Sequence, residues 1–384
     1  MLQRLLALAV VLGLKSGVDA QGYYAVRGNG AYSYAYGSYS VVGGGYYNRV
    51  YSTYGVIGGG YWNYQYSTGG YLGGGMWNWI NSNSYITITG GWYNHVYRPY
   101  GTNSGGHSNY VYGYSASLAG GMYNTVGGSY STVGGGWYNT CGNYMGTIVG
   151  GYQNRMYSYM GTVGGGRNHY TYAPHNTISG GHNNWVYSYA GTIGGGQYNY
   201  ATNKWSTVGG GWYSQANGLY STVGGGWHAH AIAYGSTVMG GWYNWAYGDY
   251  TVLGGGTSHY TYSDYQTVQG GHNHYVYAYG GSIGGGMYNS VYGYYAGIGG
   301  GHYQRIYGSY SYVGGGWWNY IYSEYGNIGG GCYNWVGGYR AAVSGGTYSG
   351  AYSSYAVVSG GQSNYIYAPY TNIVGAHNSY VYSY

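Results

Sequence analysis

Few side chains in this sequence have the types and spacing needed for metal binding or catalysis. His259 and His274 are separated by one full period of the sequence with His272 between them, and imidazoles at such a spacing could bind a metal. Asp249 and Asp264 repeat the same interval, so two adjacent carboxylates could work as in a retaining glycosidase. No further ligand follows the histidines and no cleft is indicated around the carboxylates. We therefore expect no metal site, no other cofactor and no enzymatic activity.

The two cysteines are also unsuited to chemistry within one chain. Cys141 and Cys332 are 13 repeats apart, about 62 Å at the ~4.8 Å spacing between β-strands, too far for a disulfide within one chain. We expect them to be free or to pair between chains.

Tyrosine is the side chain that dominates the sequence. The chain of 384 residues has 68 Tyr and no Phe, although a purely hydrophobic requirement would accept either ring. Tyr combines an apolar ring with a polar tip, which suits a surface that contacts water, sugar or another protein. The alternative is that Tyr serves only as a residue with high β-propensity. The residues that we expect to form an assembly or ligand face are Tyr51, Tyr66, Tyr97, Tyr157, Tyr187, Tyr277 and Tyr322.

These tyrosines are positioned by an internal repeat. Glycine-rich triads start at residues 28, 43, 58, 73 and 89, and then at every fifteenth position to 374, giving 24 coils with one inserted residue. Counted from the first residue of each triad, the tyrosines above occupy position nine, which is Tyr in 17 of 24 coils. A fixed period with so little variation in length is typical of a solenoid.

The pattern within one coil indicates the fold. Position 15 is Val, Ile or Leu in 22 of 23 coils and position 8 is mostly small or apolar, which predicts two inward stripes. Pro99, Pro174 and Pro369 all fall at position 11, which predicts a solvated corner there. Two corners imply strands near positions 4–9 and 12–1. We therefore expect an all-β fold, a single parallel β-solenoid in the form of a flattened two-sided β-roll with 24 coils, each a 15-residue repeat.

Two other positions are expected to be structural. Positions two and three are almost always Gly, which favours a tight turn with positive φ, as at Gly44, Gly45, Gly135 and Gly136. Position six is Asn in 15 coils, which predicts a hydrogen-bonded ladder of stacked amides that includes Asn48, Asn63, Asn78 and Asn139.

The first residues read as a secretory signal. Arg4 is followed by an apolar run from Leu5 to Leu14 and by small residues before Gln21. We expect residues 1–20 to be a signal peptide, residues 21–384 to be the repeat domain, and the protein to be secreted to the extracellular space or cell surface. No run is long enough for a transmembrane helix, so membrane insertion is not expected. Basic residues are scattered along the chain, which argues against a nucleic-acid partner.

One coil carries a family resemblance. The segment Ser131-Thr132-Val133-Gly134-Gly135-Gly136-Trp137-Tyr138-Asn139 resembles the Ser-Thr-Val-Gly-Gly-Gly-x-x-Asn repeats of bacterial surface proteins. Those repeats are similar to the head repeats of trimeric autotransporter adhesins, which fold as parallel β-rolls. The resemblance covers residues 28–379 and implies a β-roll. A coiled-coil stalk and membrane-anchor strands are not found in this sequence.

Three functions stay open at this stage. The first is a structural protein that forms extracellular filaments or matrix by end-to-end stacking and packing of tyrosine faces, with other copies of itself as partners. The second is an adhesin or carbohydrate-binding rod that binds extracellular glycans through Tyr and Trp. The third is an ice-binding protein, because Thr recurs at position 14, although paired Thr-x-Thr rows are lacking.

Overall fold

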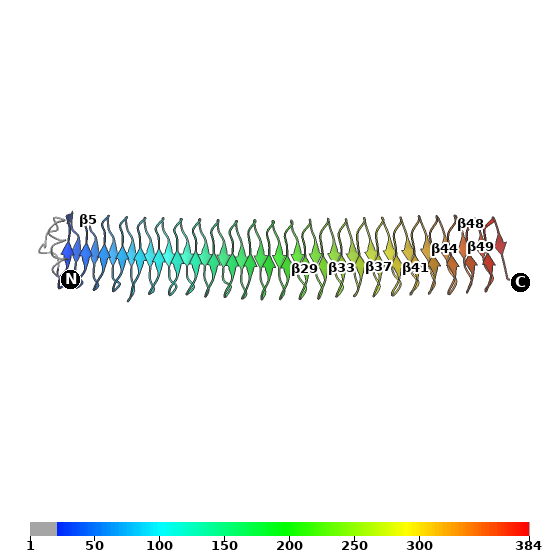
Figure 1. Cartoon of the computed structure of the whole chain (residues 1–384), viewed down its shortest axis with the longest axis horizontal. Coiled ribbons are helices and arrows are strands. Elements are labelled where there is room, and N and C mark those ends of the chain that lie inside the picture. The colour runs from blue at the N-terminus through cyan, green and yellow to red at the C-terminus, as the bar shows by residue number, and fades with distance from the viewer. Residues whose placement is uncertain (1–20, 384) are drawn as a thin grey trace. The chain divides into compact units, whose positions relative to one another are not determined.

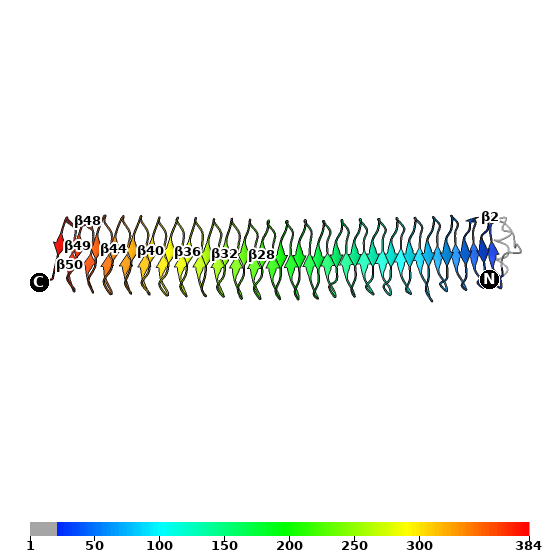
Figure 2. The same cartoon turned by 180° about the vertical axis from the view of Figure 1, so that it is seen from behind.

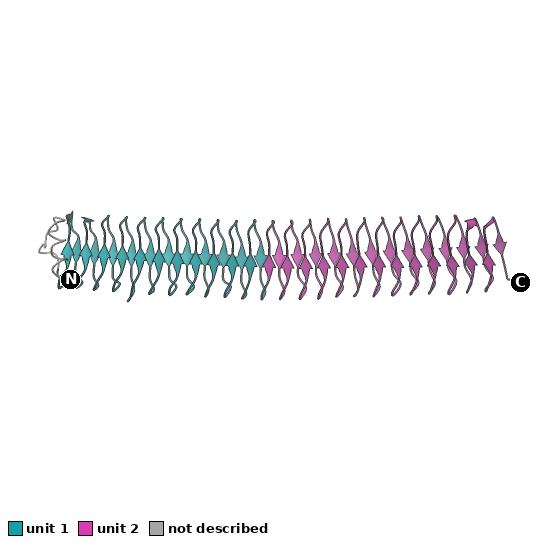
Figure 3. Ribbon diagram, viewed as in Figure 1, with its two compact units in different colours: residues 1–190 teal, residues 191–384 magenta. Residues whose placement is uncertain are grey.

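A computed structural model describes residues 21–383, so the expected signal peptide at residues 1–20 lies outside the described residues. The chain divides into two units, residues 1–190 and 191–384, which are described separately (Figure 3). Both units have the same architecture. Each is a parallel β-solenoid without helices, and the described residues make about 24 turns of about 15 residues in all, as the sequence predicted.

Each turn contributes one two-residue strand to each of two sheets. Sheet A is formed by positions 7–8 and sheet B by positions 14–15. Figure 1 shows strands of sheet B in one row: β29 (Thr222–Val223), β33 (Val252–Leu253), β37 (Ser282–Ile283) and β41 (Tyr312–Val313). Figure 2 shows strands of sheet A from behind: β28 (Gln215–Ala216), β32 (Trp245–Ala246), β36 (Tyr275–Val276) and β40 (Arg305–Ile306).

In the first unit, the strands of sheet A are β3 (Tyr34–Ala35), β6 (Arg49–Val50), β8 (Tyr64–Gln65), β10 (Trp79–Ile80), β12 (His95–Val96), β14 (Tyr110–Val111), β16 (Thr125–Val126), β18 (Thr140–Cys141), β20 (Arg155–Met156), β22 (Tyr170–Thr171) and β24 (Trp185–Val186). Those of sheet B are β1 (Val26–Arg27), β4 (Val41–Val42), β7 (Val56–Ile57), β9 (Tyr71–Leu72), β11 (Thr87–Ile88), β13 (Thr102–Asn103), β15 (Ser117–Leu118), β17 (Thr132–Val133), β19 (Thr147–Ile148), β21 (Thr162–Val163) and β23 (Thr177–Ile178). A separate pair is β2 (Gly30–Ala31) and β5 (Gly45–Tyr46).

In the second unit, the strands of sheet A are β26 (Tyr200–Ala201), β28 (Gln215–Ala216), β30 (His230–Ala231), β32 (Trp245–Ala246), β34 (Tyr260–Thr261), β36 (Tyr275–Val276), β38 (Ser290–Val291), β40 (Arg305–Ile306), β42 (Tyr320–Ile321), β44 (Trp335–Val336), β46 (Gly350–Ala351), β49 (Tyr365–Ile366) and β52 (Tyr380–Val381). Those of sheet B are β25 (Thr192–Ile193), β27 (Thr207–Val208), β29 (Thr222–Val223), β31 (Thr237–Val238), β33 (Val252–Leu253), β35 (Thr267–Val268), β37 (Ser282–Ile283), β39 (Gly297–Ile298), β41 (Tyr312–Val313), β43 (Asn327–Ile328), β45 (Ala342–Val343), β47 (Val357–Val358) and β50 (Asn372–Ile373). A separate pair is β48 (Gly361–Gln362) and β51 (Ala376–His377).

Neighbouring coils pair with a constant 15-residue register. Val133 of β17 pairs with Ile148 of β19, which pairs with Val163 of β21, and all three side chains are fully buried. The register becomes 16 only once in each sheet, between Trp79 and His95 in sheet A and between Tyr71 and Thr87 in sheet B. The inserted residue therefore lies between β10 and β11.

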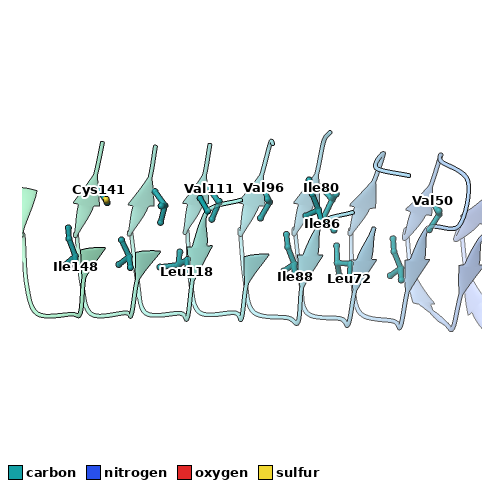
Figure 4. Packing of buried hydrophobic residues seen from close by; sticks show 14 of the residues in the cluster. Val50, Leu72, Ile80, Ile86, Ile88, Val96, Val111, Leu118, Cys141 and Ile148 are labelled. Atoms are coloured by element: carbon teal, nitrogen blue, oxygen red, sulfur yellow. The ribbon is translucent and has the colours of Figure 1, made fainter. Parts of the chain in front are cut away.

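The core is a thin layer between the two sheets. Side chains of positions 8 and 15 point toward each other, as Val50, Ile80, Val96, Leu118 and Ile148 do in Figure 4. Position 13 is a further inward row that the sequence pattern did not reveal, because it is occupied mostly by Gly, Ser and Ala, which give little hydrophobic periodicity. A Cβ atom on Gly55 would lie 2.7 Å from the Cγ1 atom of Val50, so this row has little room.

The strands are shorter than the sequence suggested because the backbone reverses its hydrogen-bonding direction at positions 5 and 12. Trp62, at position 5, has a φ of 56° and donates its N–H to Tyr46 of the preceding coil. Tyr61, beside it, donates instead to Gly75 of the following coil. Tyr54, at position 12, has a φ of 56° and donates backward to Ser38. Each reversal ends a strand.

These reversals place large aromatic residues in the left-handed region, where Gly and Asn are the usual occupants. Such strain costs on the order of 1–3 kcal/mol per residue. The rings of successive coils stack at both positions, for example Tyr47 on Trp62 at 4.4 Å and Tyr250 on Tyr265 at 5.2 Å. Aromatic pairs contribute about 0.5–1.5 kcal/mol beyond their area burial, which offsets much of this strain.

The glycine triad is constrained most strictly at position 3. Gly45, Gly136 and Gly151 have φ values of 88°, 89° and 98°, and a Cβ atom on any of them would overlap the carbonyl oxygen of the glycine in the next coil. Position 2 varies between coils: Gly135 has a φ of 139° and a Cβ atom on Gly44 would lie 2.6 Å from the carbonyl oxygen of Asn29, whereas a Cβ atom on Gly150 would have no atom within 4 Å.

We therefore predict opposite outcomes for two adjacent substitutions. Gly151→Ala should strongly destabilise the solenoid, because it combines a positive φ with a backbone overlap. Gly150→Ala should change stability by less than about 1 kcal/mol. Urea unfolding followed by circular dichroism compares the two variants, and equal losses would contradict this assignment of the turn.

Candidate functional site: aromatic rows on the solenoid surface

The outer face of sheet A carries two parallel aromatic rows, at positions 7 and 9. In the second unit, position 9 is an unbroken run of six stacked rings, with centroids 4.8–5.4 Å apart and interplanar angles of 2–5°. The rings belong to Tyr247, Tyr262, Tyr277, Tyr292, Tyr307 and Tyr322. Position 7 lies beside it, with Tyr275 6.3 Å from Tyr277. We call these two rows the tyrosine face.

The seven tyrosines singled out from the sequence all lie on this face. Tyr51 stacks on Tyr66 at 4.5 Å, and Tyr97 stacks on Tyr112 at 4.8 Å. Tyr157 and Tyr187 both contact Tyr172, and in the second unit Tyr277 and Tyr322 belong to the six-ring run. Five of the seven are more than one-third exposed, and Tyr66 and Tyr97 are half-buried.

Stacking determines what the tyrosine face presents to a partner. Two parallel rings with centroids 4.8 Å apart must overlap face to face with an offset, because coplanar rings would collide at that distance. The ring faces are therefore turned toward neighbouring coils. The ring edges and the hydroxyl groups are left to contact solvent or a partner.

A second aromatic row follows the corner at positions 11 and 12, and we call it the corner ridge. From Tyr39 to Tyr370, each coil has a Tyr, Trp or His ring at one or both of these positions, except for the coil with Thr68 and Gly69. In the second unit, twelve successive rings have centroids 4.9–6.1 Å apart. Counting positions 11 and 12 together would have revealed this row from the sequence.

The position-six asparagines form a buried row that links neighbouring coils. Asn139 donates from Nδ2 to the carbonyl oxygens of Gly135 and Gly151, and its Oδ1 accepts the backbone N–H of Asn154. Asn48 and Asn78 make the same three bonds, and Asn63 additionally bonds the Oδ1 of Asn48. The amides thus bond chiefly to backbone rather than to each other, and the row stabilises the fold instead of offering a surface.

Histidine replaces Asn at three of these positions because its ring offers similar groups. The Nδ1 atoms of His169 and His274 accept backbone N–H groups of the next coil at 3.2 Å. Burial is the largest cause that lowers the pKa of His169 and His274 to about 4 and that of His259 to about 3, and contacts with backbone groups partly oppose it. All three rings are therefore neutral at physiological pH.

The other candidate residues have structural contacts. Asp249 accepts the backbone N–H of Tyr234, and Asp264 accepts that of Asp249, each at 2.9 Å. These bonds satisfy corner N–H groups at position 11, where proline is also accepted. The rings of His259 and His274 stack at 4.9 Å, and no cluster of three or more metal-binding side chains occurs among residues 21–383. Cys141 is buried and Cys332 half-buried, both as free thiols, and burial raises the pKa of Cys141 to about 11.

Threonines at position 14 form a single row on the outer face of sheet B. Thr132, Thr147, Thr162 and Thr177 pair in register in the first unit. No helix in the described part of the chain is long and apolar enough to cross a membrane. No protein-family model and no curated protein matches the chain, so its class rests on fold and surface alone: a parallel β-solenoid with exposed aromatic rows.

The one alanine at position six provides a test of the Asn row. Ala229→Asn should raise the free energy of unfolding by about 1–2 kcal/mol. Asn244, at the same position in the next coil, bonds two backbone carbonyl oxygens and one backbone N–H, and the new amide would reach the equivalent groups one coil earlier. Ala231→Asn is the matched control, since position 8 points into the apolar core and a buried unpaired amide costs about 1–3 kcal/mol. If Ala229→Asn failed to stabilise the chain, this result would contradict the assigned bonding.

The three histidines at position six predict acid sensitivity, together with His230, which is also buried and whose pKa burial lowers to about 4. In the unfolded chain they protonate near pH 6.5, whereas in the folded chain they stay neutral until about pH 4 or below. The unfolded state therefore binds more protons between these values, and stability should fall as pH is lowered, by up to about 1.4 kcal/mol per pH unit for each histidine.

A triple variant with His169, His259 and His274 changed to Asn should remove most of this slope and keep its stability at neutral pH. Urea unfolding at pH 7 and pH 4.5 measures it, with little background because the whole chain has only 4 Asp and Glu residues. An unchanged slope would show that these rings are not the acid-sensitive groups.

Proposed function

We propose that this protein is a secreted structural protein that assembles into extracellular filaments or matrix. The tyrosine face packs on other copies, and coils stack end to end. The observation that supports this most directly is the tyrosine face itself, an exposed row in which position 9 is Tyr in 17 of 24 coils. Only 4% of the sequence is charged, so electrostatic repulsion between copies is weak.

Repetition makes the tyrosine face suitable for self-association. Two copies have the same axial period, so once a single coil is aligned, ring edges of one copy meet those of the other wherever both facing coils carry a ring. Many weak contacts then act together, as in other multivalent associations. The hydroxyl groups that protrude from the stacks both donate and accept hydrogen bonds, which suits contact between identical surfaces.

End-to-end stacking is supported by the uniform register of the coils. Within each unit, backbone groups on one side of a coil pair with backbone groups on the facing side of the next coil. The paired residues are 15 positions apart in the sequence. Any coil edge is therefore complementary to the opposite edge of another copy. A head-to-tail contact that does not close into a ring produces a filament.

Glycan binding is the second candidate function. Trp92, Trp137, Trp242 and Trp317 at position 4 are 46–51% exposed, and their large rings could stack on sugars. On the tyrosine face, however, the ring faces that a sugar would contact are covered by neighbouring coils. This favours self-association as the role of that face. Ice binding has less support, because the threonine row is single.

We predict that removing rings from the tyrosine face impairs assembly without unfolding the chain. The variant Tyr262→Ser, Tyr277→Ser and Tyr292→Ser removes three consecutive rings, each contributing about 1.5–3 kcal/mol when fully buried. The protein concentration needed for assembly should therefore rise more than tenfold. Negative-stain microscopy and sedimentation of residues 21–384 measure this.

The matched control changes the same three residues to Phe, which keeps the rings and removes only their hydroxyl groups, so assembly should weaken less than in the Ser variant. Circular dichroism verifies that both variants remain folded. If wild-type protein stays dispersed at every concentration but binds polysaccharide, the glycan-binding function replaces this proposal. If the Ser variant assembles like wild type, the tyrosine face is not the interface.

A further inference from the structure

Neighbouring rings of the corner ridge meet in two different ways. Where both residues occupy position 12, the rings stack: Tyr310 and Tyr325 are 5.2 Å apart with an angle of 9° between their planes. Where position 11 alternates with position 12, the rings are strongly inclined and most meet edge to face: Tyr234 and Tyr250 are 5.1 Å apart at 67°, whereas Tyr265 and Tyr279 are tilted at 56°. Changing between the two positions thus changes which atoms of the rings approach each other.

Two of these edge-to-face sites share a distinctive local sequence. At Tyr234-Gly235 and Tyr279-Gly280, the ring is at position 11 and glycine occupies position 12 with φ values of 60° and 69°. A Cβ atom on Gly235 would lie 3.1 Å from the ring of Tyr250, and one on Gly280 would lie 2.7 Å from the ring of Tyr295. The absence of a side chain therefore lets the ring of the next coil lean over the glycine toward the preceding tyrosine.

The lean brings an ortho carbon of the following ring over the glycine. In tyrosine the Cε atoms are the carbons ortho to the hydroxyl. The Cε1 atom of Tyr250 lies 3.3 Å from the position of a Cβ atom on Gly235, which follows Tyr234, and the Cε1 atom of Tyr295 lies 3.0 Å from that position on Gly280, which follows Tyr279. The rings of the second pair are 5.4 Å apart at 73°. Each glycine therefore allows an ortho carbon of the following ring to approach the preceding tyrosine.

We propose that Tyr234 with Tyr250, and Tyr279 with Tyr295, are two sites of oxidative coupling at which a peroxidase-type oxidant with hydrogen peroxide forms dityrosine between adjacent coils. Each site joins residues one coil apart within a single chain. The inference concerns individual chains and does not depend on filament formation.

The reaction balances with hydrogen peroxide as the oxidant. Each phenol loses one electron and one proton to give a phenoxyl radical, and the two radicals join through a carbon–carbon bond between their ortho positions. The two ortho hydrogens then move to the oxygens and restore both aromatic rings. The two electrons and two protons reduce one hydrogen peroxide to two water molecules.

Three further features favour these sites. Tyr234, Tyr250 and Tyr295 are 38%, 47% and 53% exposed, so a diffusible oxidant can reach them. Phe, which cannot form a phenoxyl radical, is absent from the whole sequence. The two cysteines are free thiols, so a carbon–carbon bond at the corner would supply the covalent link between coils that no disulfide provides.

Stacked neighbours should couple less readily. In the pair Tyr310 and Tyr325, parallel rings overlap, so each ortho carbon faces the ring of its neighbour instead of that ring's ortho edge. Coupling there would require one ring to rotate out of the stack. The geometry therefore predicts selectivity within a surface where most tyrosines are equally accessible.

The test treats dilute, dispersed protein at neutral pH with a peroxidase and hydrogen peroxide. Dityrosine fluorescence reports the yield, and mass spectrometry of chymotryptic or peptic peptides locates the cross-links. We expect links between Tyr234 and Tyr250 and between Tyr279 and Tyr295 to exceed those at stacked pairs severalfold. The oxidised chain should also unfold at a higher temperature than the untreated chain.

Matched variants separate geometry from accessibility. The double variant Y234F/Y279F keeps both rings but removes two phenols, and it should lose most of the dityrosine signal. Y310F, on a stacked part of the same ridge, should leave the signal unchanged. Circular dichroism verifies folding in each case. Full dityrosine yield in Y234F/Y279F, or cross-links spread evenly over stacked and edge-to-face pairs, would overturn the proposal.

Discussion

The constraint on which the rest of this structure depends is the hydrogen-bonded register between coils. Within each unit, each coil follows the last with a 15-residue displacement except at the one inserted residue, so the residues at a given position line up in a row. Rows of aliphatic side chains fill the core, a row of amides links the coils, and rows of rings cover the surface. An extra residue within a strand would misalign all of these rows together. The single inserted residue lies instead in the corner between β10 and β11, so the strands on either side stay paired.

The thin core makes the backbone contacts unusually important. Between the sheets there is room for only four inward positions per coil, and one of them is almost always polar. That polar row succeeds because each Asn bonds to the backbone of its own coil and of its neighbour, leaving no buried amide unsatisfied in coils such as that of Asn139. His169, His274 and Gln304 replace Asn and still offer an acceptor to the backbone N–H of the next coil.

The aromatic surface is linked to the same constraint. Left-handed residues at positions 5 and 12 reverse the backbone so that it bonds to both neighbouring coils, and stacked rings compensate for the strain. Tyrosine therefore stabilises the corners and also displays hydroxyl groups outward. A surface built in this way is both part of the fold and exposed, which is why the proposed structural function and the alternative adhesive function would draw on the same residues.

Much of this architecture can be predicted from the sequence, since a repeat of fixed length requires each position to occupy the same environment in every coil. Val133, Ile148 and Val163 could be assigned to the core, and Tyr51 or Tyr277 to the outside, because burial follows directly from the repeated pattern. Only the tertiary structure decided the row at position 13, the left-handed tyrosines such as Tyr54 and the lean of Tyr250 over Gly235. These features depend on contacts between atoms of different coils and on backbone direction, and neither is encoded in the type of a single residue.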